Sequence, residues 1–100
     1  MRITEIKGTN MELTAAIKDY VERRLSSLER LSEKYSPCDV MVEVGKTSRH
    51  HQKGEVFFAE FNLTIPGAQL RATSTQDDLY AAIDDAKDEL KRQLVDRKER

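Results

Sequence analysis

Several residue types are rare in this sequence, and each absence excludes a class of protein. Tryptophan is missing and cysteine occurs once, as Cys38, so no disulfide can form within the chain. A lone cysteine is typical of a reducing compartment, where we expect Cys38 to be a small buried or edge residue. No apolar run reaches the roughly 18 residues of a membrane span, and none follows Met1 as in a signal peptide. We therefore expect a cytoplasmic protein without membrane contact.

Neither sign of charge is in excess. Charged residues make up 35% of the 100 residues, yet the formal net charge is −1 and the isoelectric point is about 6.1. This balance excludes a uniformly basic nucleic-acid binder, so binding of a polyanion requires a local basic patch. The length predicts a single domain, residues 1–100.

Motifs of catalysis and cofactor binding are also missing. The sequence has no Gly-rich phosphate loop, no HExxH motif and no local Ser/His/Asp or Cys/His arrangement. His50 and His51 are adjacent, but neighbouring loop histidines rarely converge on one ion and no Cys or carboxylate stands at ligand spacing. We therefore expect no enzymatic activity, no cofactor, no metal site and no small-molecule substrate.

Hydrophobic periodicity predicts the element order β-α-β-β-β-α. Strands are expected over residues 2–7, 40–44 and 55–65 and around residues 70–72. A first helix should run from its N-cap Thr14 to about Lys34, and a second should follow an N-cap at Thr75. We expect an α+β fold with one four-stranded mixed sheet and two long helices on one face. The first two strands are expected to be parallel, and the last three to form an antiparallel meander.

The last expected helix, residues 78–98, combines an apolar stripe with a reversal of charge. The stripe consists of Leu79, Ile83, Ala86, Leu90 and Leu94. Acidic residues dominate before Leu90, and basic residues dominate after it. Two explanations stay open. The charges complement the helix dipole, or the basic end of the helix holds a polyanion.

Two runs in this helix carry a family resemblance. These are Asp78-Leu79-Tyr80-Ala81-Ala82-Ile83-Asp84 and Leu90-x-Arg92-Gln93-Leu94, with weaker support from Asn10-x-Glu12-Leu13-Thr14. The whole chain resembles the bacterial ribosome hibernation-promoting factor family, also called ribosome-associated inhibitor A or the sigma-54 modulation protein family. It resembles a short member or the N-terminal domain of a longer one, whose additional domain pairs ribosomes.

The resemblance implies a partner and a mode of action. Family members dock on the small ribosomal subunit, in the channel used by messenger RNA and the transfer RNA anticodons. Basic side chains on the two helices contact ribosomal RNA phosphates, and occupancy blocks initiation and preserves idle ribosomes. No catalysis is implied.

The same resemblance assigns candidate residues. The basic positions of the family fall on Arg24, Arg92, Arg97, Lys98 and Arg100, and its aspartate–tyrosine pair falls on Asp78 and Tyr80. Three positions that are often lysine in the family are instead Ser27, Glu89 and Asp96. These departures remove or reverse charge on the expected RNA face.

Helical spacing adds further candidates. Lys87, Lys91 and Lys98 fall on one flank of the last helix, beside Tyr80. They are either phosphate contacts or surface lysines that pair with nearby acids. The loop over residues 46–53 also has no acid and carries three formal positive charges, on Lys46, Arg49 and Lys53. This loop is either a basic RNA contact or an ordinary solvated loop.

Two other functions stay open. The order α-β-β-β-α after the first strand is also that of general double-stranded RNA-binding domains. Alternatively, the chain is a protein-interaction module, such as a weak homodimer formed through the open sheet face or an edge strand. Phe58 is expected on that open face, but an RNA-binding sheet needs two or three such aromatic residues.

Overall fold

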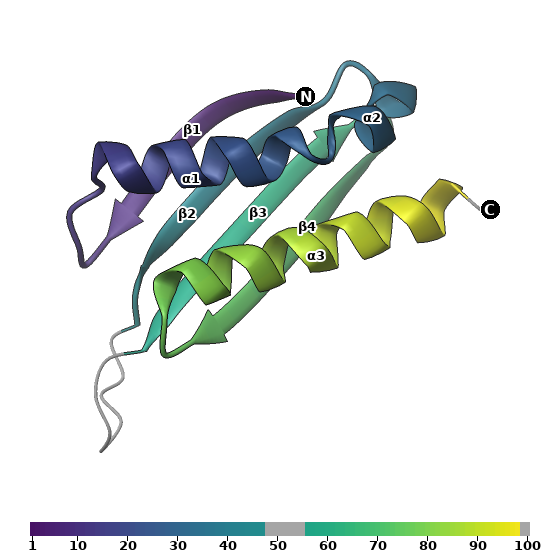
Figure 1. The fold of residues 1–100 in the computed structure, drawn as a ribbon. Coiled ribbons are helices and arrows are strands. Elements are labelled where there is room, and N and C mark those ends of the chain that lie inside the picture. The colour runs from purple at the N-terminus through teal and green to yellow at the C-terminus, as the bar shows by residue number, and fades with distance from the viewer. Residues whose placement is uncertain (48–55, 99–100) are drawn as a thin grey trace.

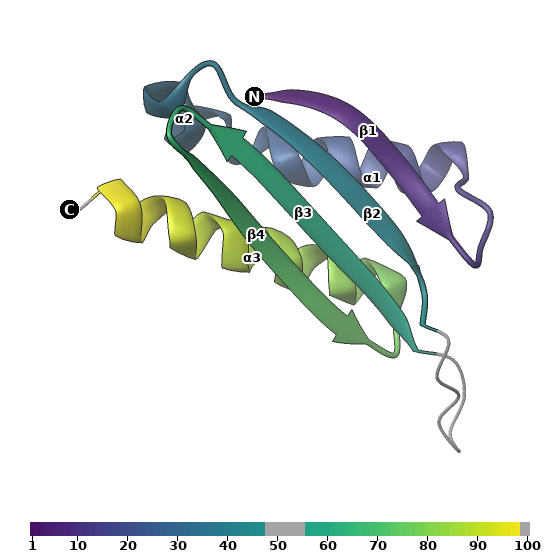
Figure 2. The same ribbon diagram turned by 180° about the vertical axis from the view of Figure 1, so that it is seen from behind.

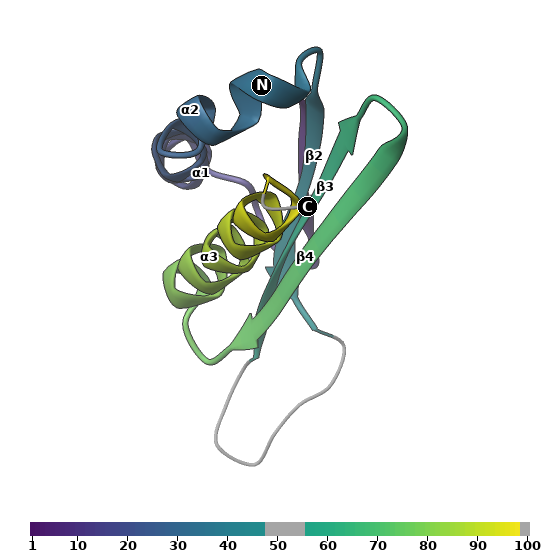
Figure 3. The ribbon, with the colours of Figure 1, turned by 90° about the vertical axis from the view of Figure 1, so that its right-hand side faces the viewer.

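A four-stranded sheet carries all the helices on one face (Figures 1 and 3). The computed structural model describes residues 1–47 and 56–98, with Lys98 described by its backbone. The elements are β1 (Arg2–Thr9), α1 (Ala15–Ser26), α2 (Glu29–Ser32), the 3₁₀ helix η1 (Glu33–Tyr35), β2 (Asp39–Lys46), β3 (Phe57–Ile65), β4 (Ala68–Gln76) and α3 (Leu79–Lys98). The predicted element order and fold class are confirmed.

The strands lie in the order β1-β2-β3-β4 (Figure 2). β1 and β2 pair in parallel, as expected for strands that are joined through a helical crossover. β2, β3 and β4 form the predicted antiparallel meander, in which Phe61 lies opposite Val42 on one side and Ala72 on the other. The alternation along these strands sends mostly apolar side chains to the helical face and mostly polar ones to the open face.

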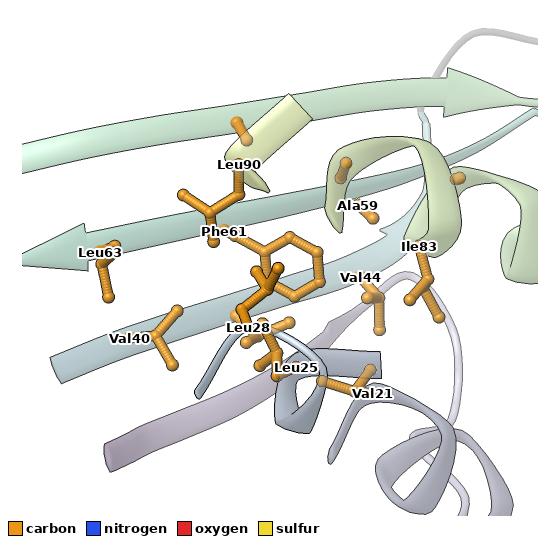
Figure 4. Close-up of a cluster of buried hydrophobic side chains, with 14 of the residues drawn as sticks. Val21, Leu25, Leu28, Val40, Val44, Ala59, Phe61, Leu63, Ile83 and Leu90 are labelled. Carbon is orange, nitrogen blue, oxygen red and sulfur yellow. The ribbon is translucent and has the colours of Figure 1, made fainter. Parts of the chain in front are cut away.

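One apolar core lies between the sheet and the helices (Figure 4). Phe61 is fully buried at its centre, where it meets the apolar stripe of α3 that includes Ile83 and Leu90. Each fully buried side chain of this size stabilises the fold by about 1.5–3 kcal/mol. Cys38 is also buried, which confirms its predicted structural position. Within the described residues, no helix is both long and apolar enough to cross a membrane.

The prediction of one continuous first helix to about Lys34 is wrong. α1 ends at Ser26, and the chain continues through the separate short segments α2 and η1. The hydroxyl of Ser26 donates to the carbonyl oxygen of Arg23 at 2.6 Å, and that of Ser27 donates to the carbonyl oxygen of Arg24 at 2.7 Å. Such serine contacts compete with the helical backbone bonds and bend helices. The two adjacent serines therefore account for the break.

The end of the sheet also differs from the prediction. β4 extends to Gln76 and is not limited to residues 70–72, because its threonines and serine pair with β3 along the whole register. Thr75 lies within β4, opposite Phe58, and is not the N-cap of the last helix. Asp78 takes that role, since its Oδ1 accepts a hydrogen bond from the backbone N–H of Tyr80 at 3.3 Å.

Candidate nucleic-acid interface

The apolar stripe of α3 separates two polar flanks. The flank that faces α1 and α2, called the groove flank, consists of Tyr80, Asp84, Lys87, Asp88 and Lys91. This surface together with the pocket beside Lys91 is called the groove. The outer flank faces β4 and consists of Asp85, Glu89, Arg92, Gln93 and Asp96. The spacing of the residues along the helix divides them into these two flanks. α3 crosses the sheet beside α1, and both helices run in the same direction (Figure 1).

The middle of the groove flank is occupied by ion pairs. Asp84 Oδ1 accepts a hydrogen bond from the hydroxyl of Tyr20 at 2.7 Å and lies 2.8 Å from Arg24 Nε, without the alignment of a hydrogen bond to that nitrogen. The contact with Asp84 raises the pKa of Tyr20. One turn further along α3, Lys87 Nζ lies 2.6 Å from Asp88 Oδ1, and this contact is the main cause that lowers the pKa of Asp88. The acids of the groove are therefore already neutralised by cations.

A pair of tyrosines closes the end of the groove near the start of α3. The ring centroids of Tyr20 and Tyr80 are 4.7 Å apart, and the ring planes are at 88°, an edge-to-face arrangement. Tyr80 keeps 40% of its surface exposed. Packing between the two helices thus fixes the place of Tyr80 while leaving part of it open to solvent.

A pocket of about 530 Å³ lies at the other end of the groove. It is lined by Ser27, Arg30, Leu31, Glu33, Lys34 and Lys91. Within residues 1–47 and 56–98, the cationic groups of Arg30, Lys34 and Lys91 form no ion pair. Three cations without an ion-pair partner and one carboxylate, that of Glu33, therefore share the pocket lining. The net charge of the lining is positive, so it can meet the closely spaced negative charges of a polyanion.

The outer flank has a different electrostatic arrangement. Arg92 Nη2 lies 2.6 Å from Glu89 Oε1, and Arg92 Nη1 lies 2.7 Å from Asp96 Oδ2. Two hydrogen bonds from Arg92 and one from Gln93 lower the pKa of Glu89 to about 2. Gln93 also donates to the backbone carbonyl oxygen of Arg71 at 2.8 Å and so ties α3 to the edge strand β4. The charge of Arg92 is thus compensated inside the molecule.

The structure places the predicted site residues in different environments. Lys91 is exposed in the groove, whereas Arg24 and Arg92 are engaged in ion pairs. Lys87 lies on the predicted flank, but its residue surface is only 8% exposed, and its ammonium group pairs with Asp88. This ion pair agrees with the interpretation of Lys87 as a lysine paired with a nearby acid, and its contact with phosphate stays a prediction.

The remaining candidates lie near the ends of the described segments. Arg97 is half-buried beside a smaller pocket of about 230 Å³ on the outer flank, and Lys46 ends β2. Arg49, Lys53 and Arg100 lie outside the described residues, as do His50 and His51. Arg30 and Lys34 are not among the residues that the sequence predicts for the site. Their place in the pocket depends on the break after α1, for which the Ser26-Ser27 pair was the available signal.

The open face of the sheet offers no comparable cluster of unpaired cations in the described segments. Arg2 Nε lies 3.1 Å from Asp39 Oδ1, and Arg71 Nη2 lies 2.7 Å from Glu60 Oε1. Burial would raise the pKa of Glu60, but its hydrogen bonds with Asn62 and Arg71 lower it overall. Phe58 on this face is half-buried, so one partly exposed aromatic ring is available there. The described cations of the open face therefore contribute less uncompensated charge than the groove pocket.

The fold and the groove define a class of small α+β domains that present basic side chains from paired helices. The chain matches the family model described as Sigma 54 modulation protein / S30EA ribosomal protein over residues 4–100, and it belongs to this family. It is 36% identical over 94 residues to the Ribosome hibernation promotion factor of Deinococcus radiodurans, a match that covers 94% of this chain and 48% of that protein. It therefore spans about half the length of that relative.

Another relative is matched over most of its length. The chain is 35% identical over 95 residues to the Ribosome hibernation promoting factor of Azotobacter vinelandii, covering 95% of this chain and 81% of that protein. Membership in this family confirms the predicted resemblance. It also agrees with the expectation of a binding protein rather than an enzyme.

Two solved structures share the architecture. The Thermus thermophilus Protein Y N-terminal domain matches with a TM-score of 0.70 and 37% identity, over 94% of this chain and 96% of that chain. A ribosomal subunit interface protein from Coxiella burnetii matches with a TM-score of 0.82 over the full length of both chains, at 19% identity. The second similarity establishes a common fold.

Proposed function

We propose that this protein is a ribosome-associated hibernation factor that binds the small ribosomal subunit and keeps idle ribosomes inactive. Its site would be the channel used by messenger RNA and transfer RNA, where ribosomal RNA phosphates face the groove between α1, α2 and α3. The ribosome as partner is supported by the family and by relatives that are named ribosome hibernation factors. A ribosome-bound protein of this kind would act in the cytoplasm.

The observation that carries the proposal is the cluster of unpaired cations in the groove pocket. Arg30, Lys34 and Lys91 line one pocket, and none of them forms an ion pair within the described part of the chain. Neutralising phosphates with such side chains releases condensed counterions, which drives binding to RNA. A net charge of −1 disfavours unspecific attraction to RNA, so that this local cluster would restrict contact to one face.

The remaining predicted RNA contacts have supporting roles in this proposal. Arg24 and Lys87 compensate Asp84 and Asp88, which would otherwise repel phosphate. Arg92 contributes less than its charge suggests, because Glu89 and Asp96 already neutralise it. Arg97, Lys98 and Arg100 remain predicted RNA contacts, as the family resemblance implies. The loop residues Lys46, Arg49 and Lys53 remain predicted contacts.

Cosedimentation with isolated small subunits, repeated between about 50 and 200 mM salt, tests the proposal. The expected result is saturable, salt-sensitive binding of one copy per subunit. The variant R30Q/K34Q/K91Q should bind more weakly and with a smaller salt slope. The matched control is R2Q/K7Q/R71Q, which removes three positive charges from the open sheet face and should bind like the unsubstituted protein.

Three outcomes would overturn parts of the proposal. Absence of binding at low salt would reject the ribosome as partner and direct the search to proteins. Equal binding by the groove variant and the unsubstituted protein would reject the groove as the RNA contact. Equal affinity for a plain RNA duplex and for the small subunit would instead favour a general double-stranded RNA-binding domain.

A further inference from the structure

The groove joins an exposed aromatic ring to the basic pocket along one flank of α3. Tyr80 and Lys91 are separated by eleven residues, which corresponds to about 16 Å at the helical rise of 1.5 Å per residue. Their helical positions differ by only about 20°, so both side chains leave α3 on the same flank. A single elongated ligand can therefore contact both.

Tyr80 has the properties of a stacking platform. It is one of two large hydrophobic residues exposed in residues 1–47 and 56–98, the other being Met41 on the open sheet face. Its ring is held edge-to-face by Tyr20, whose hydroxyl is in turn anchored on Asp84. The hydroxyl of Tyr80 has no hydrogen-bond partner among the described residues. A rigid aromatic ring with two rotatable bonds loses little entropy when it binds a flat ligand.

The surface between Tyr80 and the pocket does not repel a negatively charged backbone. Asp84 and Asp88 face the groove, but each lies beside a cation, Arg24 and Lys87 respectively. An uncompensated carboxylate at either position would repel a nucleic-acid backbone that passes along the flank. At the Lys91 end, three cations stand against the one carboxylate of Glu33, so the net charge there is positive.

We infer that the groove holds an unpaired RNA strand, with one base stacked on Tyr80 and backbone phosphates at Arg30, Lys34 and Lys91. A base within a duplex is covered on both faces by its neighbours, whereas an unpaired base can lie against an aromatic ring. This inference rests on the proposed function, because the groove must first contact RNA. It adds the class of RNA that is recognised and a role for Tyr80.

The test compares Tyr80→Ala and Tyr80→Phe in binding to a short, fluorescently labelled single-stranded RNA, measured by anisotropy. Tyr80→Ala should weaken binding by roughly 5- to 150-fold, the range found when aromatic residues that stack on bases are replaced. Tyr80→Phe keeps the ring and should bind within about twofold of the unsubstituted protein. An oligonucleotide with abasic nucleotides should bind equally weakly to the protein with and without Tyr80→Ala.

The abasic oligonucleotide keeps the test valid if Tyr80→Ala disturbs the fold, because it removes the base and leaves the protein unchanged. A second measurement is the salt dependence of the affinity for the same single-stranded RNA. R30Q/K34Q/K91Q should lower its logarithmic slope by about 2, since each phosphate contact contributes about 0.7.

Several results would overturn the inference. They are tight binding to the abasic strand, equal affinities of Tyr80→Ala and the unsubstituted protein, an unchanged salt slope, or a preference for duplex RNA. Absence of any binding to single strands would overturn it as well, even if the protein cosediments with small subunits. Absence of binding between the unsubstituted protein and small subunits is a separate result, and it would overturn the proposed function.

Discussion

The two flanks of α3 carry neighbouring cations that differ in whether they form an ion pair within the described residues. Lys91 on the groove flank is exposed and forms no ion pair within the described segments, while Arg92, the next residue, is held between Glu89 and Asp96. The difference follows from the residues three and four positions away. Asp88, three positions before Lys91, is already paired with Lys87, whereas both acids beside Arg92 are free to bind it.

This comparison shows that formal charge is a poor measure of binding capacity. Glu89 and Asp96 stand where the family resemblance leads us to expect lysine, and they convert a candidate phosphate ligand into an internal salt bridge. The outer flank has thereby lost available positive charge. The groove flank keeps it, because the ion pairs of its acids are formed by Arg24 and Lys87 and not by Lys91.

The largest expected effect concerns the stripe between the flanks. Leu90→Ala removes a fully buried side chain from the core beneath both flanks, and should lower the free energy of unfolding by about 2–5 kcal/mol. Urea denaturation followed by circular dichroism measures this loss. Variants of Lys91 and Arg92 should stay within about 0.5 kcal/mol of the unsubstituted protein, so that their binding effects are not effects of unfolding. A loss below about 1 kcal/mol for Leu90→Ala would contradict its place in the core.

The second prediction compares the flanks directly. Lys91→Gln and Arg92→Gln remove the same charge from adjacent residues. We expect Lys91→Gln to weaken binding to small subunits by roughly tenfold or more, because it loses a charged contact with phosphate. Arg92→Gln should cost less than about threefold, since its charge is already compensated. Equal losses in cosedimentation, or a larger loss for Arg92→Gln, would contradict the difference between the flanks.

The third prediction restores charge to the outer flank. E89K/D96K releases Arg92 and adds two lysines, so binding to small subunits should tighten and its logarithmic salt slope should steepen by about 2. A double variant of the open sheet face, T73K/T64K, adds two lysines elsewhere and serves as the control. If E89K/D96K behaves like this control, the outer flank does not face RNA.

The smallest expected effect is the pH dependence of the outer flank. The folded-state pKa of Glu89 is about 2, below its ordinary value of 4.5, so the unfolded chain binds the additional proton between these values. The stabilising contribution of Glu89 is therefore present above about pH 4.5 and is lost as the pH falls through about 2. Glu89→Gln should flatten this part of the stability profile, by an amount that screening by solvent keeps small. A profile unchanged by Glu89→Gln would show that the contact with Arg92 does not persist in solution.

Much of the fold could be predicted from the sequence. Apolar residues alternate strictly in residues 57–65, which only a strand satisfies, so this strand and its buried face followed directly. The apolar stripe of α3 has the helical period, so the last helix followed as well. Element ends were less certain, because they depend on competing local contacts. Thr75 illustrates this, since pairing with Phe58 keeps it in β4 although its side chain suits an N-cap.

The candidate site was harder to predict than the fold. Tyr80 and Lys91 could be placed on one flank by helical spacing, but Arg30 and Lys34 could not be placed beside them. Their position depends on the break at Ser26 and on how α2 and η1 dock against α3.

The sequence by itself determined the order of the elements, the buried face of each and the family, because hydrophobic period and motif are properties of the chain. Only the tertiary structure decided which cations remain available to a partner. Two of the three pocket cations reach the groove from α2 and η1, across the helix packing, whereas Arg24 is neutralised by Asp84 across the same interface. Such contacts join residues far apart in the chain, and their strength depends on distances that folding alone sets.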